Sequence, residues 1–274
     1  MARLLPLRAP SPGHAQRPGL SDSRLAVVSL GATAGVLVAW YLVTATGWIS
    51  TLFLPSPTMV WREAMKLVSS GELWYHVLTS ARRVFVGYLL SAAVAIPVGV
   101  LMGTSRVAKA AIDPLLSLIR PLPSLSWIPL SILWFGIGES QKYAIVFMGT
   151  FAATLLYVAE ATKRVDPLLV LAARNLGANS LEIMREVILP GALPGIVSGL
   201  KVSLAISWTV VLSAEMVAAN RGLGALIWFG KDWNNLALIM VGMALISATV
   251  FTIDTLFRAM EGRLIPWERH RFRR

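Results

Sequence analysis

Residues 172–194 read AARNLGANSLEIMREVILPGALP, and this polar stretch separates two long apolar segments of the chain. It carries two basic and two acidic side chains, at Arg174, Glu182, Arg185 and Glu186. Charged side chains are costly inside a bilayer. The stretch is therefore expected to lie outside the hydrocarbon, at the surface of a membrane protein.

The composition of the whole chain assigns it to the same class. Of its 274 residues, 56% are hydrophobic and 14% are charged, and the mean hydropathy is +0.67, far from the balance of a soluble domain. A helix needs about 20 apolar residues to cross the hydrocarbon, and the sequence lacks the short alternating strands of a barrel. We predict an all-α membrane protein with six transmembrane helices, at residues 25–46, 84–103, 113–137, 142–160, 196–217 and 237–257.

The predicted transmembrane domain covers residues 25–267, between a Pro- and Arg-rich, disordered tail at 1–24 and a basic tail at 268–274. With both tails in the cytoplasm, more than twice as many lysines and arginines lie inside as outside. Arg82 and Arg83 are an exception, because they begin the second span from outside. The net charge of +11 thus indicates topology and attraction to the anionic lipids of the bilayer, rather than binding of nucleic acid.

The polar stretch itself predicts two helices joined by a turn. Asp166 is placed to cap a first helix whose first residue is Pro167, and Gly177 supplies the left-handed conformation that ends it. Asn179 then caps a second helix, with Glu182 three residues later in capping-box spacing.

The second helix is expected to end at Pro190 and Pro194, before the fifth span. The result is a helix-turn-helix loop over 161–195 between spans 4 and 5. Its exposed tip, at Leu176, Gly177, Ala178 and Asn179, is available to a soluble partner. An ordinary amphipathic loop without a partner is the alternative.

The spacing of this loop resembles that of the cytoplasmic loop by which bacterial ABC importer permeases dock on their ATPase. The family pattern is Glu-Ala-Ala, three residues, Gly, nine residues, an aliphatic residue, one residue and Leu-Pro, and Leu171 replaces the leading Glu. The matching positions are Ala172, Ala173, Gly177, Val187, Leu189 and Pro190. The resemblance implies an ATPase-coupling role for Ala172, Ala173, Arg174, Leu176, Gly177, Ala178, Asn179, Leu189 and Pro190.

The third span is interrupted by prolines. Asp113 and Pro114 predict its start, and the Arg120-Pro121-Leu122-Pro123 run and Pro129 break its hydrogen bonds. Such breaks are tolerated where the backbone is buried in protein or lines a water-filled cavity. The run RPLPSLSWIPLSILWFGIGES resembles the corresponding span of permeases for taurine, alkanesulfonates, nitrate and bicarbonate. Candidate pathway residues are Arg120, Pro123, Ser126, Trp127, Ser207 and Trp208.

Arg120 admits two interpretations. If the span begins at Asp113, the guanidinium lies about 10 Å inside it and could contact an anionic solute on its way through. If the span begins later, Arg120 lies at the level of the inner head groups.

The other charged residues near the spans favour structural roles. Glu160, Glu215 and Asp254 fall near span ends, at the head-group boundary, and Lys201 is expected to extend toward the inner surface. The outer segment 47–83 predicts an amphipathic helix at the interface, either as an anchor or as part of a solute site. The run at 219–224, ANRGLG, resembles the outer edge of the fifth span in taurine-like permeases and is placed to receive the binding protein.

The sequence lacks the residues that an enzyme, a metal site or an ATP-binding site would need. The chain has no cysteine, its three histidines, His14, His76 and His270, fall in predicted tails or loops, and no phosphate-binding Gly-x4-Gly-Lys-Ser/Thr loop occurs. We therefore expect neither an enzyme nor a metal or cofactor site in this chain. An ion-coupled secondary transporter is the alternative, although the chain shows neither an internal repeat nor a carboxylate central to a span.

The resemblance covers residues 48–267 and implies the membrane-spanning permease subunit of a bacterial ATP-driven importer in the inner membrane. Its fold would be that of a type I importer permease. Its partners would be a second copy of the chain, two ATPase subunits that use ATP and Mg, and a periplasmic or lipid-anchored solute-binding protein. A small anionic solute is expected, with taurine or another sulfonate first and nitrate or bicarbonate next. Other small organic solutes remain open, because the binding protein makes most of the choice.

Overall fold

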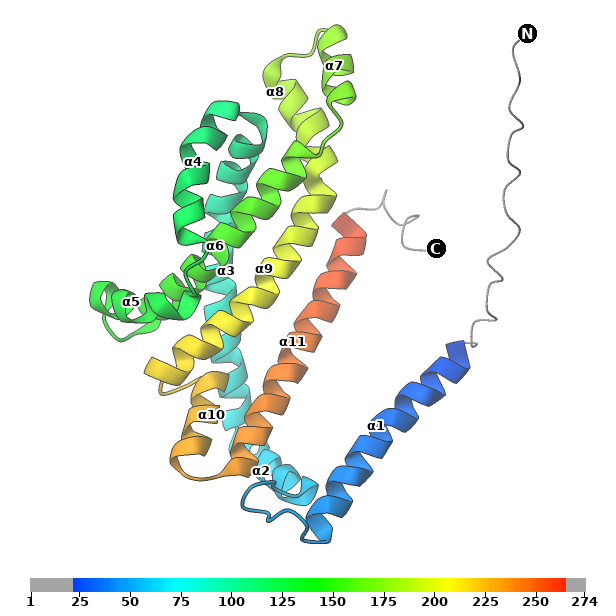
Figure 1. The fold of residues 1–274 in the computed structure, drawn as a ribbon, viewed down its shortest axis with the longest axis vertical. Helices are drawn as coiled ribbons and strands as arrows, with labels where there is room; N and C mark the ends of the chain where they lie inside the picture. Colours follow the sequence, from blue (N-terminus) through cyan, green and yellow to red (C-terminus); the bar gives the residue numbers. More distant parts are fainter. Residues whose placement is uncertain (1–21, 265–274) are drawn as a thin grey trace, which may run out of the picture. The chain divides into compact units, whose positions relative to one another are not determined.

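The computed structural model describes residues 22–264, and these residues form helices and connecting turns without a β-strand (Figure 1). The all-α prediction is confirmed. The elements are α1 Asp22–Ala45, α2 Pro57–Ser69, α3 Glu72–Thr104, α4 Arg106–Ile119, η1 Ser124–Trp127, α5 Ile128–Phe135, α6 Glu139–Lys163, α7 Pro167–Asn175, α8 Ser180–Glu182, η2 Ile183–Ile188, α9 Leu189–Ala218, α10 Leu223–Asp232 and α11 Leu236–Leu264.

The chain divides into two compact units, with the boundary after Pro57. In the first unit, α1 contains nearly all of the predicted first span. A hydrogen bond of 3.0 Å from Trp40 Nε1 to the Pro55 carbonyl ties the segment that follows α1 back to the helix. Most of the two predicted tails lies outside the described residues.

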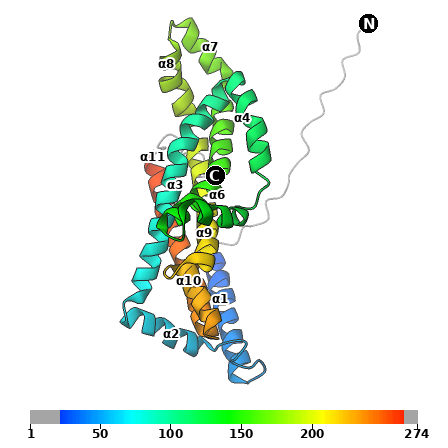
Figure 2. The ribbon, with the colours of Figure 1, turned by 90° about the vertical axis from the view of Figure 1, so that its left-hand side faces the viewer.

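Three long helices, α3, α6 and α9, lie side by side in the second unit (Figures 1 and 2). Glycines permit their close approach: a Cβ added at Gly87 of α3 would lie 2.5 Å from Val146 Cβ of α6, and one at Gly199 of α9 would lie 2.4 Å from Tyr157 Cβ. Small residues let membrane helices pack backbone to backbone, which favours dispersion contacts. The buried core between the helices contains Val84, Tyr88, Val146, Leu204, Trp208, Val211 and Leu223.

Within residues 22–264, five helices are long and apolar enough to cross a membrane, and the number rises to six if the bent pair of α4 with η1 and α5 forms one span. The predicted span 142–160 lies within α6 and the predicted span 237–257 within α11. The second span was predicted too short, because α3 begins at Glu72 and not near 84. Arg83 does not mark a boundary with water, since its charge is paired inside the protein.

The predicted start of the third span is wrong. α4 begins after Ser105, whose side chain accepts a hydrogen bond from the Ala108 N–H, and Pro114 lies inside this helix. α4 ends just before the predicted break at residues 120–123. The axis of α4 and the axis of the following segment, η1 with α5, meet at 89°. The segment 113–137 is thus a sharply bent pair of helices and not one straight span.

The predicted end of the second loop helix is also wrong. α8, η2 and α9 follow one another without a break from Ser180 to Ala218, with Pro190 near the start of α9 and Pro194 inside it. η2, a π-helical turn, immediately precedes α9. A π-turn shifts the hydrogen-bond register and so helps to accommodate a residue without an N–H. A further helix that was not predicted, α10, lies between α9 and α11.

Candidate functional site

The α7–α8 hairpin has the geometry that its sequence predicts. Asp166 Oδ1 accepts a hydrogen bond of 2.9 Å from the Leu168 N–H at the start of α7. At the other end, Gly177 has φ 86°; its N–H donates to the Arg174 carbonyl and the Ala178 N–H donates to the Ala173 carbonyl, each at 3.0 Å. These two bonds form a Schellman motif, which satisfies the last carbonyls of the helix.

The second helix of the hairpin starts with the predicted capping box. Asn179 Oδ1 accepts hydrogen bonds of 3.0 Å from the N–H groups of Leu181 and Glu182. Glu182 Oε2 in turn accepts the Asn179 N–H at 2.7 Å. Both ends of the turn are therefore stabilised by local hydrogen bonds.

The hairpin stands at one end of the second unit, and α2 and α10 lie at the other (Figures 1 and 2). Leu176 at the turn is 88% exposed, whereas Ile183 at the start of η2 is buried. Leu189 and Pro190, which the resemblance assigned to the coupling loop, lie at the start of α9, away from the tip. An apolar side chain so exposed on a rigid turn is typical of a contact surface.

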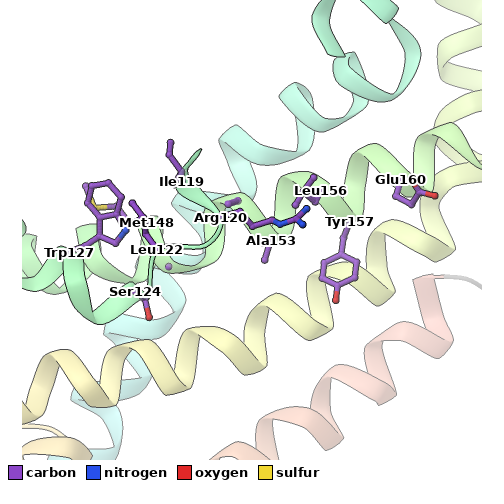
Figure 3. Close-up of a pocket in the computed structure, with 12 residues that line it drawn as sticks. Ile119, Arg120, Leu122, Ser124, Trp127, Met148, Ala153, Leu156, Tyr157 and Glu160 are labelled. Carbon is purple, nitrogen blue, oxygen red and sulfur yellow. The ribbon is translucent and has the colours of Figure 1, made fainter. Parts of the chain in front are cut away.

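A pocket of about 540 Å³ lies where the break after α4 faces α6 (Figure 3). Arg120 and Trp127 line it, and the Arg120 side chain extends along α6 toward Tyr157. Among residues 22–264, no carboxylate forms an ion pair with Arg120. The pocket is thus lined by the Arg120 guanidinium, which has no ion-pair partner among the described residues and could bind an anion.

The pocket also contains residues that the sequence analysis had not assigned to a pathway. Ser124 lines it from η1, and Ala153, Tyr157 and Glu160 line it from α6. The three α6 residues are four and three positions apart and so share one helix face. This i, i+4, i+7 spacing is the sequence pattern that could have identified them as neighbours. Glu160 was predicted only to lie at a head-group boundary.

The structure does not bring the predicted pathway residues into one site. Pro123 and Ser126 are exposed at the break but do not line the pocket. Ser207 is buried in α9, where its hydroxyl donates to the Leu204 carbonyl at 2.5 Å. Trp208, also buried, lines a different pocket, between α9 and α11.

A cluster of buried charges lies toward the other end of the unit. Arg83 of α3 is 3% exposed, and its guanidinium contacts Glu139 of α6 at 2.5 Å and Glu215 of α9 at 2.7 Å. Glu215 is fully buried and also accepts a hydrogen bond of 2.8 Å from Ser80 Oγ. Glu215 lies near the end of α9, as predicted, and it is enclosed by protein, which supports the structural role predicted for it.

The same cluster fixes the turn before α10. The Gly224 N–H donates to Glu215 Oε2 at 2.9 Å, and the Leu223 N–H donates to Ser80 Oγ at 2.8 Å. The Gly222 N–H donates to Nδ1 of His76 at 3.0 Å, and the histidine is buried in α3 rather than in a loop as predicted. The segment 219–224 is thus held against α3 and α9.

In the described part of the chain, no group of three or more His, Asp or Glu residues is arranged to hold a metal ion. The chemistry available at these sites is recognition of charge and shape: a free cation in a pocket, a rigid hairpin and a buried ion network.

The buried network yields a stability prediction. Arg83→Ala leaves Glu215 as a buried, unpaired carboxylate, which is expected to lower the free energy of unfolding by about 3–5 kcal/mol. Arg164→Ala is the matched control, because it removes an exposed pair with Glu160 that contributes about 0–1 kcal/mol. The measurement is thermal unfolding of both variants in the same detergent. Equal stability of the two variants would contradict the role given to the network.

Comparison with known proteins is consistent with this fold. Residues 95–270 match the family model described as "Binding-protein-dependent transport system inner membrane component". The chain is 34% identical over 250 residues to the taurine transport system permease protein TauC of Escherichia coli K12, covering 89% of this chain and 91% of TauC. It is 32% identical over 233 residues to the putative aliphatic sulfonates transport permease protein SsuC of the same organism, covering 85% and 89%.

Among solved structures, an inward-facing form of the MetNI methionine ABC transporter shares the fold. The TM-score is 0.55 at 23% identity, over 67% of this chain and 94% of that chain. The predicted type I importer permease fold is therefore confirmed. The chain belongs to the family of inner-membrane permease components of binding-protein-dependent ABC transport systems.

Proposed function

We propose that this permease carries a small sulfonate, with taurine as the first candidate, and that the α7–α8 hairpin docks on a separate ATPase subunit. The observation that carries the coupling role is the hairpin itself, whose turn is fixed by a Schellman motif and a capping box and exposes Leu176. The sulfonate assignment is supported by the names of the two relatives. Nitrate or bicarbonate is the next candidate.

The connection between hairpin and body supports a mechanical role. α8, η2 and α9 form one continuous helical run from Ser180 to Ala218. A displacement of the hairpin is therefore passed directly to α9, which packs along α6. In the proposed mechanism, closure of two ATPase subunits draws two hairpins together and shifts the spans between inward-open and outward-open states.

Two hairpins require two copies of this chain, so we include a homodimer with two ATPase subunits and one solute-binding protein in the proposal. ATP and Mg would be used by the ATPase, and this chain would hold no cofactor. The hairpin and both tails would face the cytoplasm, as the distribution of basic residues favours.

Within this proposal, the pocket at Arg120 is a solute-binding site on the transport pathway. Its guanidinium lies beside a break in the membrane helices and is not paired with a carboxylate in the described residues. A sulfonate offers three oxygens to a guanidinium, and such charge-assisted hydrogen bonds are about twice as strong as neutral ones. An ion-coupled transporter is disfavoured, because Glu215, the fully buried carboxylate of α9, is already bound to Arg83.

Uptake of labelled solutes tests the proposed function directly. Cells with and without this chain are given labelled taurine or labelled nitrate, with ATP supply and proton gradient varied independently. We expect loss of the chain to abolish ATP-dependent taurine uptake and to leave nitrate uptake unchanged. Uptake that follows the proton gradient alone would contradict ATP coupling, and a taurine signal that is independent of the chain would remove the sulfonate assignment.

The turn of the hairpin provides a test of coupling. Gly177 has φ 86°, a conformation that Asn tolerates and that is strained for a β-branched residue. Gly177→Val is therefore expected to lower ATP-dependent uptake by about tenfold or more, since a strain of ~1–3 kcal/mol disturbs the turn. Gly177→Asn, the control, keeps most of the uptake. Both variants are compared at equal membrane levels, and normal uptake by Gly177→Val would refute the coupling role.

A third experiment concerns Arg120. Arg120→Ala is expected to slow uptake of the anionic solute by about tenfold or more, because a hydrogen bond to a charged group is worth ~1.5–3 kcal/mol. Arg106→Ala, which removes an exposed arginine at the start of α4, is the control. Initial uptake rates are measured at several solute concentrations. An Arg120→Ala variant as fast as the control would place Arg120 outside the pathway.

A further inference from the structure

A second pocket, of about 320 Å³, lies between α9 and α11 and has no part in the mechanism described above. Lys201, Asp254 and Phe257 line one end of it. Trp208 and Ser247 line the other end, about seven residues further along each helix, or ~10 Å. The walls between the two ends are apolar: Leu204, Ala205, Val250, Phe251 and Ile253.

The charged end of the pocket carries an excess of positive charge. Lys201 Nζ lies 3.6 Å from Asp254 Oδ1, and Arg258 Nε donates to Asp254 Oδ2 at 2.8 Å. Two cations thus share one carboxylate. The side chains of Lys201 and Asp254 are 32% and 30% exposed, so both are accessible to a further group. An anion bound here would balance the remaining charge.

The depth of the charged end is that of lipid head groups. On α11, residues 236–253 contain no charged side chain, and about 18 residues at ~1.5 Å each span ~27 Å. This is close to the ~30 Å of the hydrocarbon. Asp254 therefore ends the apolar run, on the same side as the hairpin that precedes α9.

Polarity thus falls along the pocket, from a cationic end at head-group depth to an apolar slot that extends toward the membrane centre. Phe251 in the wall is 70% exposed, which leaves apolar surface to be covered. A small soluble anion would satisfy the charge but leave the slot empty. An amphiphile with an anionic head and a hydrocarbon chain matches both ends.

We propose that this pocket binds an anionic phospholipid from the leaflet on the side of the hairpin, with its phosphate between Lys201 and Arg258 and one acyl chain along the slot. The bound lipid bridges α9, the helix continuous with the hairpin, and α11. This site is separate from the Arg120 pocket, and its existence does not depend on which solute is transported.

The test is native mass spectrometry of the full-length chain, purified in mild detergent in the assembly that it forms. Phosphatidylglycerol and phosphatidylcholine with identical acyl chains are added at equal concentration. We expect the wild-type chain to retain phosphatidylglycerol about tenfold more than phosphatidylcholine, because two cations face the phosphate. The double variant with Lys201→Gln and Arg258→Gln is expected to lose this preference.

Two further variants separate the slot from general surface charge. Ala205→Phe fills the slot and keeps every charge, so it is expected to lose the retained phosphatidylglycerol. Arg106→Gln removes a positive charge elsewhere and should bind as the wild type does. Glycerol phosphate, which has the anionic head without acyl chains, should not displace the lipid.

Each opposite result would overturn the proposal. Equal retention of the two lipids by the wild type, or a preference that survives in the double variant, would show that the cluster does not recognise the head group. Full retention by Ala205→Phe would place the acyl chain elsewhere. Displacement by glycerol phosphate would make the site one for small soluble anions, and a slot occupied by a second copy of the chain would leave no retained lipid.

Discussion

The Arg83 guanidinium binds Glu139 of α6 and Glu215 of α9 from its place on α3, and so it connects the three helices on which the second unit is built. The arrangement requires close helices, and the glycines at the α3–α6 and α6–α9 contacts provide that proximity. It also requires full pairing, because a charge buried alone costs far more than a paired one. The second oxygen of Glu215, Oε2, accordingly accepts hydrogen bonds from Ser80 Oγ and from the Gly224 N–H, and the bond with Gly224 fixes the start of α10.

The hairpin at the opposite end is built differently. It has almost no buried side chains, and its shape comes from hydrogen bonds between neighbouring residues, from Asp166 at its start to the Asn179 and Glu182 pair after the turn. Local bonds of this kind keep the tip rigid while leaving it uncovered. One end of the second unit is thus held by a buried network between distant residues, whereas the other end is an exposed hairpin that is continuous with α9.

This difference explains what could be predicted from the sequence. The hairpin was predicted almost residue by residue, because caps and turns depend on residues three to five positions apart. The spans were predicted from apolar length, but the start of α3 was missed because Arg83 was assigned to water. Its partners Glu139 and Glu215 are 56 and 132 positions away, and no local pattern reports such a contact. Ser207 and Trp208 were grouped with Arg120 for the same reason. In the structure, Ser207 is buried in α9 and Trp208 lines the pocket between α9 and α11.

Arg83, Arg120 and Lys201 illustrate how a partner decides the role of a cation next to apolar sequence. Arg83 pairs with two carboxylates and is almost fully buried, so its charge serves the structure. Lys201 shares Asp254 with Arg258, which leaves a positive excess at the mouth of an apolar slot. Arg120 forms no ion pair among residues 22–264 and faces a pocket of about 540 Å³. Binding of an anion is most favourable at an unpaired cation, because no existing ion pair must be broken. The number of carboxylate partners therefore agrees with a structural role for Arg83 and with the roles proposed for Lys201 in lipid binding and for Arg120 in solute passage.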